Sequence, residues 1–291
     1  MNNRVYISGY WQLKNNVKKS PGVYLNGIEK TFKLIKNSTL YFFTEDEVLK
    51  PFLKESAKKN NIHIEIIHRT LESLPANKYI ENVINSADAT NFEHCLNLNQ
   101  FNYRSSQEKG FIHYFRDYKH SGKDNYKNLL RIWLSKILLV NEIIAKHNKN
   151  NRADVLYSWI DCTAERFSYT RKNWNFTKVD LPINKFSHYS GSLFYMGVRL
   201  PISASFMSGG EKIWEEVETL FINELERAAS TAYAHDEETL LTNIVYKNPD
   251  LFYLIGSDLI SKYVECFQKN GKFIFKRYVY YRNKIHELLT K

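Results

Sequence analysis

The sequence predicts an α/β fold with a mainly parallel central sheet, and three observations support this prediction. Short runs of β-branched and aromatic residues alternate with amphipathic stretches along residues 5–67, which is typical of parallel α/β folds. Residues 154–163 begin with a further apolar run, which indicates a buried strand. That run ends at the carboxylate of Asp161, and ligands of open α/β sheets bind outside the carboxyl ends of the strands.

Asp161 has two interpretations. A carboxylate at the end of a central strand is well sited to hold a divalent metal or a sugar hydroxyl. Aspartate also favours turns and the first positions of helices, so a purely structural cap is the alternative.

The first part of the chain supplies the alternating pattern. Gly9 permits a tight turn or the close approach of a ligand. Acidic residues at 45–47 precede the second helix, where they complement its dipole, and Pro51 is tolerated near the start of that helix. The predicted strands lie at 5–11, 39–44 and 62–67, and the predicted helices lie at 27–35 and 48–59.

The middle of the chain contains one long helix and one irregular stretch. Residues 71–118 are rich in Asn, Gln and Ser, and we expect short helices and an active-site loop there. An amphipathic helix is predicted over residues 125–147. Lys136 lies within its apolar face, where the side chain either snorkels to solvent or points into the site. A polar break at 148–152 precedes the strand that leads to Asp161.

The second half of the chain contains a glycine pair at a predicted strand-to-helix corner. Without side chains, Gly209 and Gly210 let a ligand come close to the backbone, and the following helix N-terminus favours negative charge. A plain turn is the alternative. The predicted strands of this half lie at 190–196, 201–206 and 251–255, and its helices lie at 212–229 and 235–246.

His235, Asp236 and Glu237 open the last of these helices. The structural interpretation is a helix cap with acidic residues that complement the dipole. A histidine beside two carboxylates is also suited to metal binding and to proton transfer. Consecutive helical residues point about 100° apart. We therefore expect one carboxylate to enter the site and another to remain a solvent-facing cap.

Composition bounds the partners and the compartment. A net charge of +10 and 15% aromatic residues suit an anionic partner, such as a nucleic acid, a nucleotide, a phosphorylated lipid or an anionic membrane face. Three widely spaced cysteines without a Cys-x-x-Cys pair argue against a disulfide framework and fit a reducing cytoplasm. No apolar run approaches transmembrane length, so we expect a cytoplasmic protein whose membrane contact, if any, is peripheral.

Four segments in a fixed order carry a resemblance to a known family. They are the strand at residues 5–10, residues 159–161, the glycine corner at 206–210, and residues 235–238 ahead of a Leu-Leu pair. As a set they resemble a nucleotide-sugar glycosyltransferase of the GT-A type. More closely, they resemble the HtrL/YibB-like family of bacterial proteins found among surface-polysaccharide genes. The resemblance covers nearly the whole chain and is thinnest over residues 71–118.

The resemblance implies one GT-A-like, Rossmann-like domain over residues 1–291, with a mainly parallel sheet flanked by helices. It divides the domain into a nucleotide-binding half at 1–150, a metal and acceptor half at 151–270, and a basic, aromatic tail at 271–291. The implied activity is the transfer of a sugar from a nucleotide-sugar donor to a glycan or glycolipid acceptor beside the inner membrane face. Lipopolysaccharide, lipooligosaccharide and capsule are acceptors of this kind.

The usual GT-A metal motif, Asp-x-Asp, is incomplete here because Thr163 stands at the second carboxylate's position. The resemblance implies that Mn²⁺ or Mg²⁺ rests on Asp161, His235 and the donor diphosphate. An inverting enzyme also needs a carboxylate base for the acceptor hydroxyl, for which Asp236 and Glu237 are the candidates, whereas a retaining enzyme does not need that base in the same place. Asp236 is favoured as the contact to the acceptor or donor sugar, and Glu237 is the reserve candidate. The residues assigned to donor and nucleotide binding are Ser8, Gly9, Tyr10, Trp11, Lys136, Trp159, Gly209 and Gly210.

Two other functions also fit the sequence. The missing second carboxylate is compatible with a GT-A-like protein that has lost catalysis and only binds glycan or a partner. The charge and aromatic content are compatible with a nucleic-acid-binding protein. However, no helix-turn-helix, zinc or RNA-binding motif is present, so no nucleic-acid partner is expected.

Overall fold

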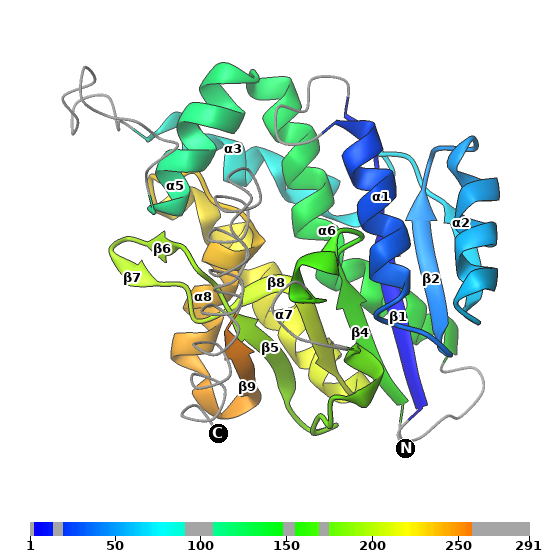
Figure 1. The fold of residues 1–291 in the computed structure, drawn as a ribbon. Helices are drawn as coiled ribbons and strands as arrows, with labels where there is room; N and C mark the ends of the chain where they lie inside the picture. The colour runs from blue at the N-terminus through cyan, green and yellow to red at the C-terminus, as the bar shows by residue number, and fades with distance from the viewer. Residues whose placement is uncertain (1–2, 14–19, 91–106, 148–154, 169–174, 258–291) are drawn as a thin grey trace, which may run out of the picture.

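A computed structural model of the chain describes residues 3–13, 20–90, 107–147, 155–168 and 175–257 (Figure 1). Seven strands form its central sheet. They are β1 Asn3–Gly9, β2 Thr39–Thr44, β3 His63–His68, β4 Val155–Ile160, β5 Phe186–Ser190, β8 Ser203–Gly209 and β9 Phe252–Ser257. A separate short hairpin pairs β6 Phe194–Tyr195 with β7 Val198–Arg199.

The order of the strands confirms the expected α/β fold with a mainly parallel sheet. It is β3-β2-β1-β4-β8-β5-β9. β8 pairs antiparallel with both of its neighbours, β4 and β5. The other pairings within this sheet are parallel. All strands of this seven-stranded sheet except β8 therefore end at the same edge, called here the carboxyl edge.

Helices cover both faces of the sheet (Figure 1). One face packs on α1 Pro21–Phe32 and α2 Leu49–Lys59, and the other on α3 Ile80–Asp88, α6 Lys123–His147, α7 Glu211–Arg227 and α8 Glu237–Lys247. Shorter helices connect these elements. They are η1 Pro75–Tyr79, α5 Lys109–Ile112, η2 His113–His120, η4 Ala164–Ser168, η5 Phe176–Lys178, η6 Ala228–Ser230 and η7 Pro249–Leu251.

β4 lies at the centre of the sheet and is buried on both faces. Its side chains alternate, as strand geometry requires. Tyr157 and Trp159 enter the core under α6, whereas Leu156 and Ile160 enter the core under α1 and α2. This double burial explains the apolar run in the sequence, because both faces of a central parallel strand are covered. It also fixes the point at which the chain emerges, at Asp161.

Most predicted elements are confirmed, with one clear exception. The strands predicted at 39–44, 62–67 and 154–160 and the helix predicted at 125–147 agree with β2, β3, β4 and α6 to within two residues. The strand predicted at 190–196 is wrong, because β5 ends at Ser190 and the chain then enters the β6–β7 hairpin.

The irregular stretch and the tail have different outcomes. The short helices expected within 71–118 are present as η1, α3, α5 and the π-helical η2, while residues 91–106 lie outside the described residues. The basic tail predicted at 271–291 also lies outside them. None of the helices in the described ranges is long and apolar enough to span a membrane.

Burial of a histidine in β5 makes the stability of the sheet depend on pH. Burial lowers the pKa of His188 to about 4, against the opposing effect of a hydrogen bond to the carbonyl of Tyr189. The unfolded chain titrates near pH 6.5. The contribution of neutral His188 is therefore complete above pH 6.5 and is lost as the pH falls towards 4. We expect a loss of about 3 kcal/mol in the free energy of unfolding over this range.

Urea denaturation of the wild type and of His188→Gln at several pH values between 7 and 4 measures this effect. The variant should show a shallower decline, since glutamine keeps a donor for the Tyr189 carbonyl and does not titrate. Parallel declines for the two proteins would show that His188 is not buried in its neutral form.

Candidate functional site

The candidate site lies at the carboxyl edge of the sheet, directly after β4. The backbone N–H of Asp161 donates to the carbonyl of Ser205 at 2.9 Å, which extends the β4–β8 pairing by one residue. The side chain of Asp161 is 27% exposed. Its Oδ1 accepts the indole N–H of Trp159 at 2.9 Å. The predicted position of Asp161, at the end of a buried central strand, is therefore confirmed.

Lys136 points from α6 into this edge and does not snorkel to solvent. Its Nζ lies 2.8 Å from Oδ1 of Asp161 and 2.7 Å from Oε1 of Glu237. It also donates to the carbonyl of Ala204 at 3.3 Å. Burial by itself lowers the pKa of Lys136, but the two carboxylates outweigh burial and raise the pKa above its ordinary value. The ammonium group is therefore charged at neutral pH.

Glu237 is the first residue of α8, and its carboxylate turns toward Lys136. The side chain is almost fully buried. Burial raises the pKa of Glu237; the Lys136 ammonium opposes this effect, and the Asp236 carboxylate adds to it. The second carboxylate oxygen, Oε2, is buried and has no hydrogen-bond partner among the described residues. A buried carboxyl group with these properties is suited to accept and release a proton.

Asp236 caps α8. Its Oδ1 accepts the N–H of Thr239 at 3.0 Å, and the Thr239 hydroxyl accepts the N–H of Asp236 at 3.0 Å, which completes a capping box. The other oxygen, Oδ2, lies 2.5 Å from Nζ of Lys109 and 2.9 Å from Nε2 of His113. Burial raises the pKa of Asp236, but these two partners outweigh burial and lower the pKa far below its ordinary value.

These contacts give the two carboxylates different surroundings. Glu237 shares an ammonium group with Asp161, whereas Asp236 is committed to capping and to buried ion pairs. The expected division between one carboxylate in the site and one cap is present. However, the cap is buried and does not face solvent.

A second buried lysine links the start of α8 to α5. Lys109 pairs with Glu238 as well as with Asp236. Glu238 in turn accepts the backbone N–H of Ala204 at 2.9 Å through its other oxygen. Ala204 thus contacts both lysine networks, because its carbonyl accepts from Lys136. The first residues of β8 are therefore held by the side chains that open α8.

His113 extends this second network into the π-helix. Its Nδ1 lies 2.8 Å from Oδ2 of Asp117, and its Nε2 contacts Asp236. Each ring nitrogen of His113 therefore faces a carboxylate oxygen, one from η2 and one from the start of α8. Arg116 donates to both oxygens of Asp117 at 2.8 Å. Sequence reasoning missed these residues, although Lys109, His113 and Asp117 recur at the four-residue spacing of one helix face.

His235, the expected metal ligand, is enclosed by side chains from α6, β6 and the start of α8. Its Nδ1 lies 3.1 Å from the Thr239 hydroxyl. Its ring lies against those of Tyr195 and Tyr233, with centroids 6.0 and 5.1 Å away, and its carbonyl accepts the Tyr126 hydroxyl at 2.7 Å. Burial lowers the pKa of His235 to about 4, so the ring is neutral at pH 7.

The donor groups near Asp161 do not fit the expected Mn²⁺ or Mg²⁺ site. The Lys136 ammonium already lies against Asp161. Thr163, at the second position of the incomplete motif, packs its methyl group toward Gly27 of α1. In the ranges that the structure describes, no group of three or more His, Cys, Asp or Glu side chains is placed to hold a metal ion.

The end of β1 reaches the same edge, but its residues contact protein. The Trp11 ring lies over Gly9, where an added Cβ would come within 2.5 Å of it, and the indole N–H donates to the Arg69 carbonyl at 2.7 Å. Tyr10 stacks at an angle on Tyr24, and burial raises its pKa to about 12. The buried hydroxyl of Ser8 has no partner among the described residues.

The glycine corner lies at the opposite edge of the sheet. Because β8 runs antiparallel to β4, Gly209 pairs with Tyr157 and not with the end of β4. The N–H of Gly210 donates to the Ile183 carbonyl at 2.9 Å, and an added Cβ would lie 2.7 Å from that oxygen. The backbone that approaches the glycines is therefore that of Ile183. The structure does not bring this pair to Asp161.

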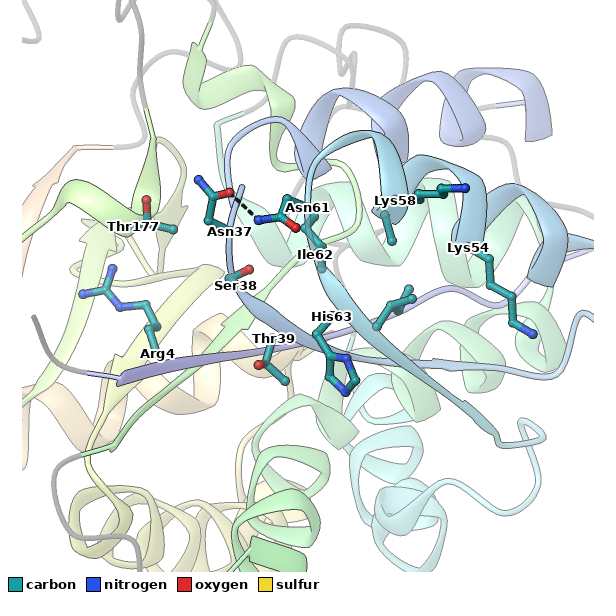
Figure 2. A pocket seen from close by; sticks show the side chains of 12 residues that line it. Arg4, Asn37, Ser38, Thr39, Lys54, Lys58, Asn61, Ile62, His63 and Thr177 are labelled. Carbon is teal, nitrogen blue, oxygen red and sulfur yellow. Dashed lines mark hydrogen bonds between the residues drawn. The ribbon is translucent and has the colours of Figure 1, made fainter.

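A hollow of about 1050 Å³ also lies at the opposite edge, near the start of β2 and β3 (Figure 2). Lys54 and Lys58 extend from α2 beside it, and Asn37 and Asn61 are joined across it by a 2.8 Å hydrogen bond. Arg4 also lines it and donates to two backbone carbonyls. The hollow is basic, and none of the predicted site residues lines it.

Comparison with known proteins does not identify the chain. No protein-family model matches it, and no curated protein sequence is significantly similar to it. The assignment of a function therefore depends on the geometry of the carboxyl edge.

The roles of Asp236 predict the effect of removing its carboxylate. Asp236→Ala removes a helix cap, worth about 1 kcal/mol, and breaks buried pairs with Lys109 and His113, where losing one partner costs about 3–5 kcal/mol. We expect the free energy of unfolding, measured by urea denaturation, to fall by about 3 kcal/mol or more. Asp236→Asn keeps a good cap without the charge. Its free energy of unfolding should lie between those of the wild type and Asp236→Ala. A loss below about 0.5 kcal/mol would contradict this structural role.

The close contact between Gly210 and Ile183 predicts that a side chain added at Gly210 lowers the stability of the fold. Gly210→Ala forces its new methyl group against Ile183 and should cost about 1–3 kcal/mol of stability. Gly22→Ala in α1 is the matched control, because nothing lies within 4 Å of its added Cβ. Thermal unfolding measures both variants. Equal melting temperatures for the two would contradict the close contact between Gly210 and Ile183.

Proposed function

We propose that this chain is a GT-A-type glycosyltransferase that transfers a sugar from a nucleotide-sugar donor to a surface glycan or glycolipid acceptor. One observation carries the proposal: Asp161 and Glu237 share the Lys136 ammonium at the carboxyl end of the central parallel strand. Ligands of open α/β sheets bind at this edge. The resemblance to the HtrL/YibB-like family agrees with this reaction class.

The two carboxylates differ in ways that suit them to different tasks. Asp161 is partly exposed, and Trp159 and Lys136 hold one of its oxygens in place. A fixed carboxylate of this kind accepts hydrogen bonds from sugar hydroxyls. Glu237 is buried, its pKa is raised, and its Oε2 lacks a partner among the described residues. We therefore assign to Glu237 the role of base for the acceptor hydroxyl.

The charge of the chain supports an anionic donor and an anionic acceptor surface. The net charge of +10 attracts a nucleoside diphosphate and a phosphate-bearing glycolipid at the inner membrane face over distances of about the screening length. Such a field raises the rate of encounter and leaves the recognition of the sugar to the fixed groups of the site. A cytoplasmic protein that touches the membrane peripherally would meet both substrates.

A glycan-binding protein without catalysis is the second candidate. Thr163 packs against α1 where the usual motif has a carboxylate, and this observation favours binding without transfer. The two candidates agree on sugar recognition at Asp161. They differ in whether Glu237 moves a proton, so turnover separates them.

A thermal-shift screen against nucleoside diphosphates and their sugars tests the proposal first. Binding to the folded state raises the melting temperature, by an amount that corresponds to about 2.7 kcal/mol at a hundredfold excess over Kd. Hydrolysis of the donor that binds then measures turnover. Asp161→Asn and Glu237→Gln should each lower turnover by a factor of about 10² or more. Turnover is compared at a temperature where thermal unfolding shows each variant to be folded.

The exposed Asp250→Asn is the matched control and should leave turnover unchanged. Donor binding without turnover in the wild type would favour the glycan-binding candidate. The absence of binding to every nucleotide tested, together with salt-sensitive binding to generic DNA or RNA, would overturn the proposal in favour of a nucleic-acid-binding protein.

A further inference from the structure

We propose that Lys136 takes the place of a divalent cation at the end of β4, so that the Asp161–Glu237 pair is complete without metal. The observation behind this is the set of groups around one nitrogen atom. Nζ of Lys136 has a carboxylate oxygen of Asp161 at 2.8 Å, one of Glu237 at 2.7 Å and the carbonyl oxygen of Ala204 at 3.3 Å.

These groups are of the kind that a hard cation selects. Mg²⁺ and Ca²⁺ bind carboxylate and carbonyl oxygens, at about 2.0–2.1 Å and 2.3–2.6 Å respectively. An ammonium group has three N–H donors, and Lys136 has three such oxygens. The two distances to carboxylate oxygens are those of charge-assisted hydrogen bonds, and the contact with the Ala204 carbonyl is longer, at 3.3 Å. All three distances exceed those of metal coordination. The Lys136 ammonium therefore binds oxygen atoms of the kind that form part of the ligand shell in a metal site.

The surroundings keep the ammonium in this position. Lys136 extends from the middle of α6, between Ser135 and Ile137, which are both fully buried. The ammonium also lies 5.9 Å from the centre of the Trp159 ring, on the side that favours a cation. A metal ion that approached Asp161 and Glu237 would have to displace a cation that is covalently tethered and buried.

The charge of the site predicts what happens when the ammonium is removed. Lys136, Asp161 and Glu237 together carry one negative charge when both acids are ionised. Without the lysine they carry two, in a site from which much of the water is excluded. Lys136→Ala also leaves space where the ammonium was. The variant should therefore bind one divalent cation that the wild type does not bind.

Calorimetric titration with MnCl₂ after chelator treatment tests this without reference to any activity. The wild type should bind no Mn²⁺ at this site, Lys136→Ala should bind one ion, and Lys136→Ala with Asp161→Asn should bind none. Lys146→Ala is the matched control, because Lys146 lies on the same helix and pairs with Glu65, but at the surface. It should bind no more Mn²⁺ than the wild type.

Two results would overturn the inference. One is a Mn²⁺ ion bound by the wild type and lost in Asp161→Asn. The other is a folded Lys136→Ala protein that binds no Mn²⁺. If Lys136→Ala does not fold, with or without Mn²⁺, the comparison between the wild type and Asp161→Asn decides: binding by the wild type that Asp161→Asn abolishes overturns the inference, and no such binding supports it.

A consequence for the donor rests on the proposed function. The affinity for UDP or GDP, whichever binds, should differ by less than about twofold between excess EDTA and Mn²⁺. A tenfold weaker affinity in EDTA would overturn metal independence. If neither nucleotide binds in either condition, the proposed function fails, while the Mn²⁺ titration still decides the role of Lys136.

Discussion

The ion pairs of Lys136 are the interaction on which the arrangement of the site depends. One ammonium group on α6 contacts three other elements. It pairs with Asp161 after β4 and with Glu237 at the start of α8, and it donates to the carbonyl of Ala204 at the start of β8. Removing one partner of a buried ion pair is far more costly than the pair is stabilising, at about 3–5 kcal/mol. Moving β4 or α8 away from α6 would therefore separate the buried Lys136 ammonium from one of its two carboxylates.

The start of α8 shows how three consecutive acids can have three different partners. Successive helical side chains diverge by about 100°. Asp236 caps the helix and meets Lys109 and His113, Glu237 meets Lys136, and Glu238 meets Lys109 and the N–H of Ala204. The two lysines thus come from different helices and approach α8 from different sides. The helix cap at Asp236 and the contact of Glu237 with Lys136 are therefore one residue apart in sequence.

The sequence predicted local structure better than it predicted partners. The buried strand before Asp161 and the long helix carrying Lys136 follow from hydrophobic pattern, which is a local property. The strand β5 was missed because it buries Ser187 and His188, which a pattern of apolar residues does not register. The distance of the glycine corner from Asp161 could not be predicted, because local sequence does not show that β8 runs antiparallel to β4. The different partners of Asp236 and Glu237 could not be predicted, because those partners lie more than 100 residues away in sequence.

The distribution of charge relates the site to the surface. The chain as a whole carries a net charge of +10, and the hollow at the amino ends of β2 and β3 is basic. By contrast, the group formed by Lys136, Asp161 and Glu237 at the carboxyl edge carries one negative charge when both acids are ionised. A long-range positive field attracts phosphate-bearing molecules, whereas fixed carboxylates with saturated counter-charges bind hydroxyl groups and move protons. The basic hollow and the acidic site lie at opposite edges of the sheet. The positive charge therefore acts on the acidic site through its long-range field and not by direct contact.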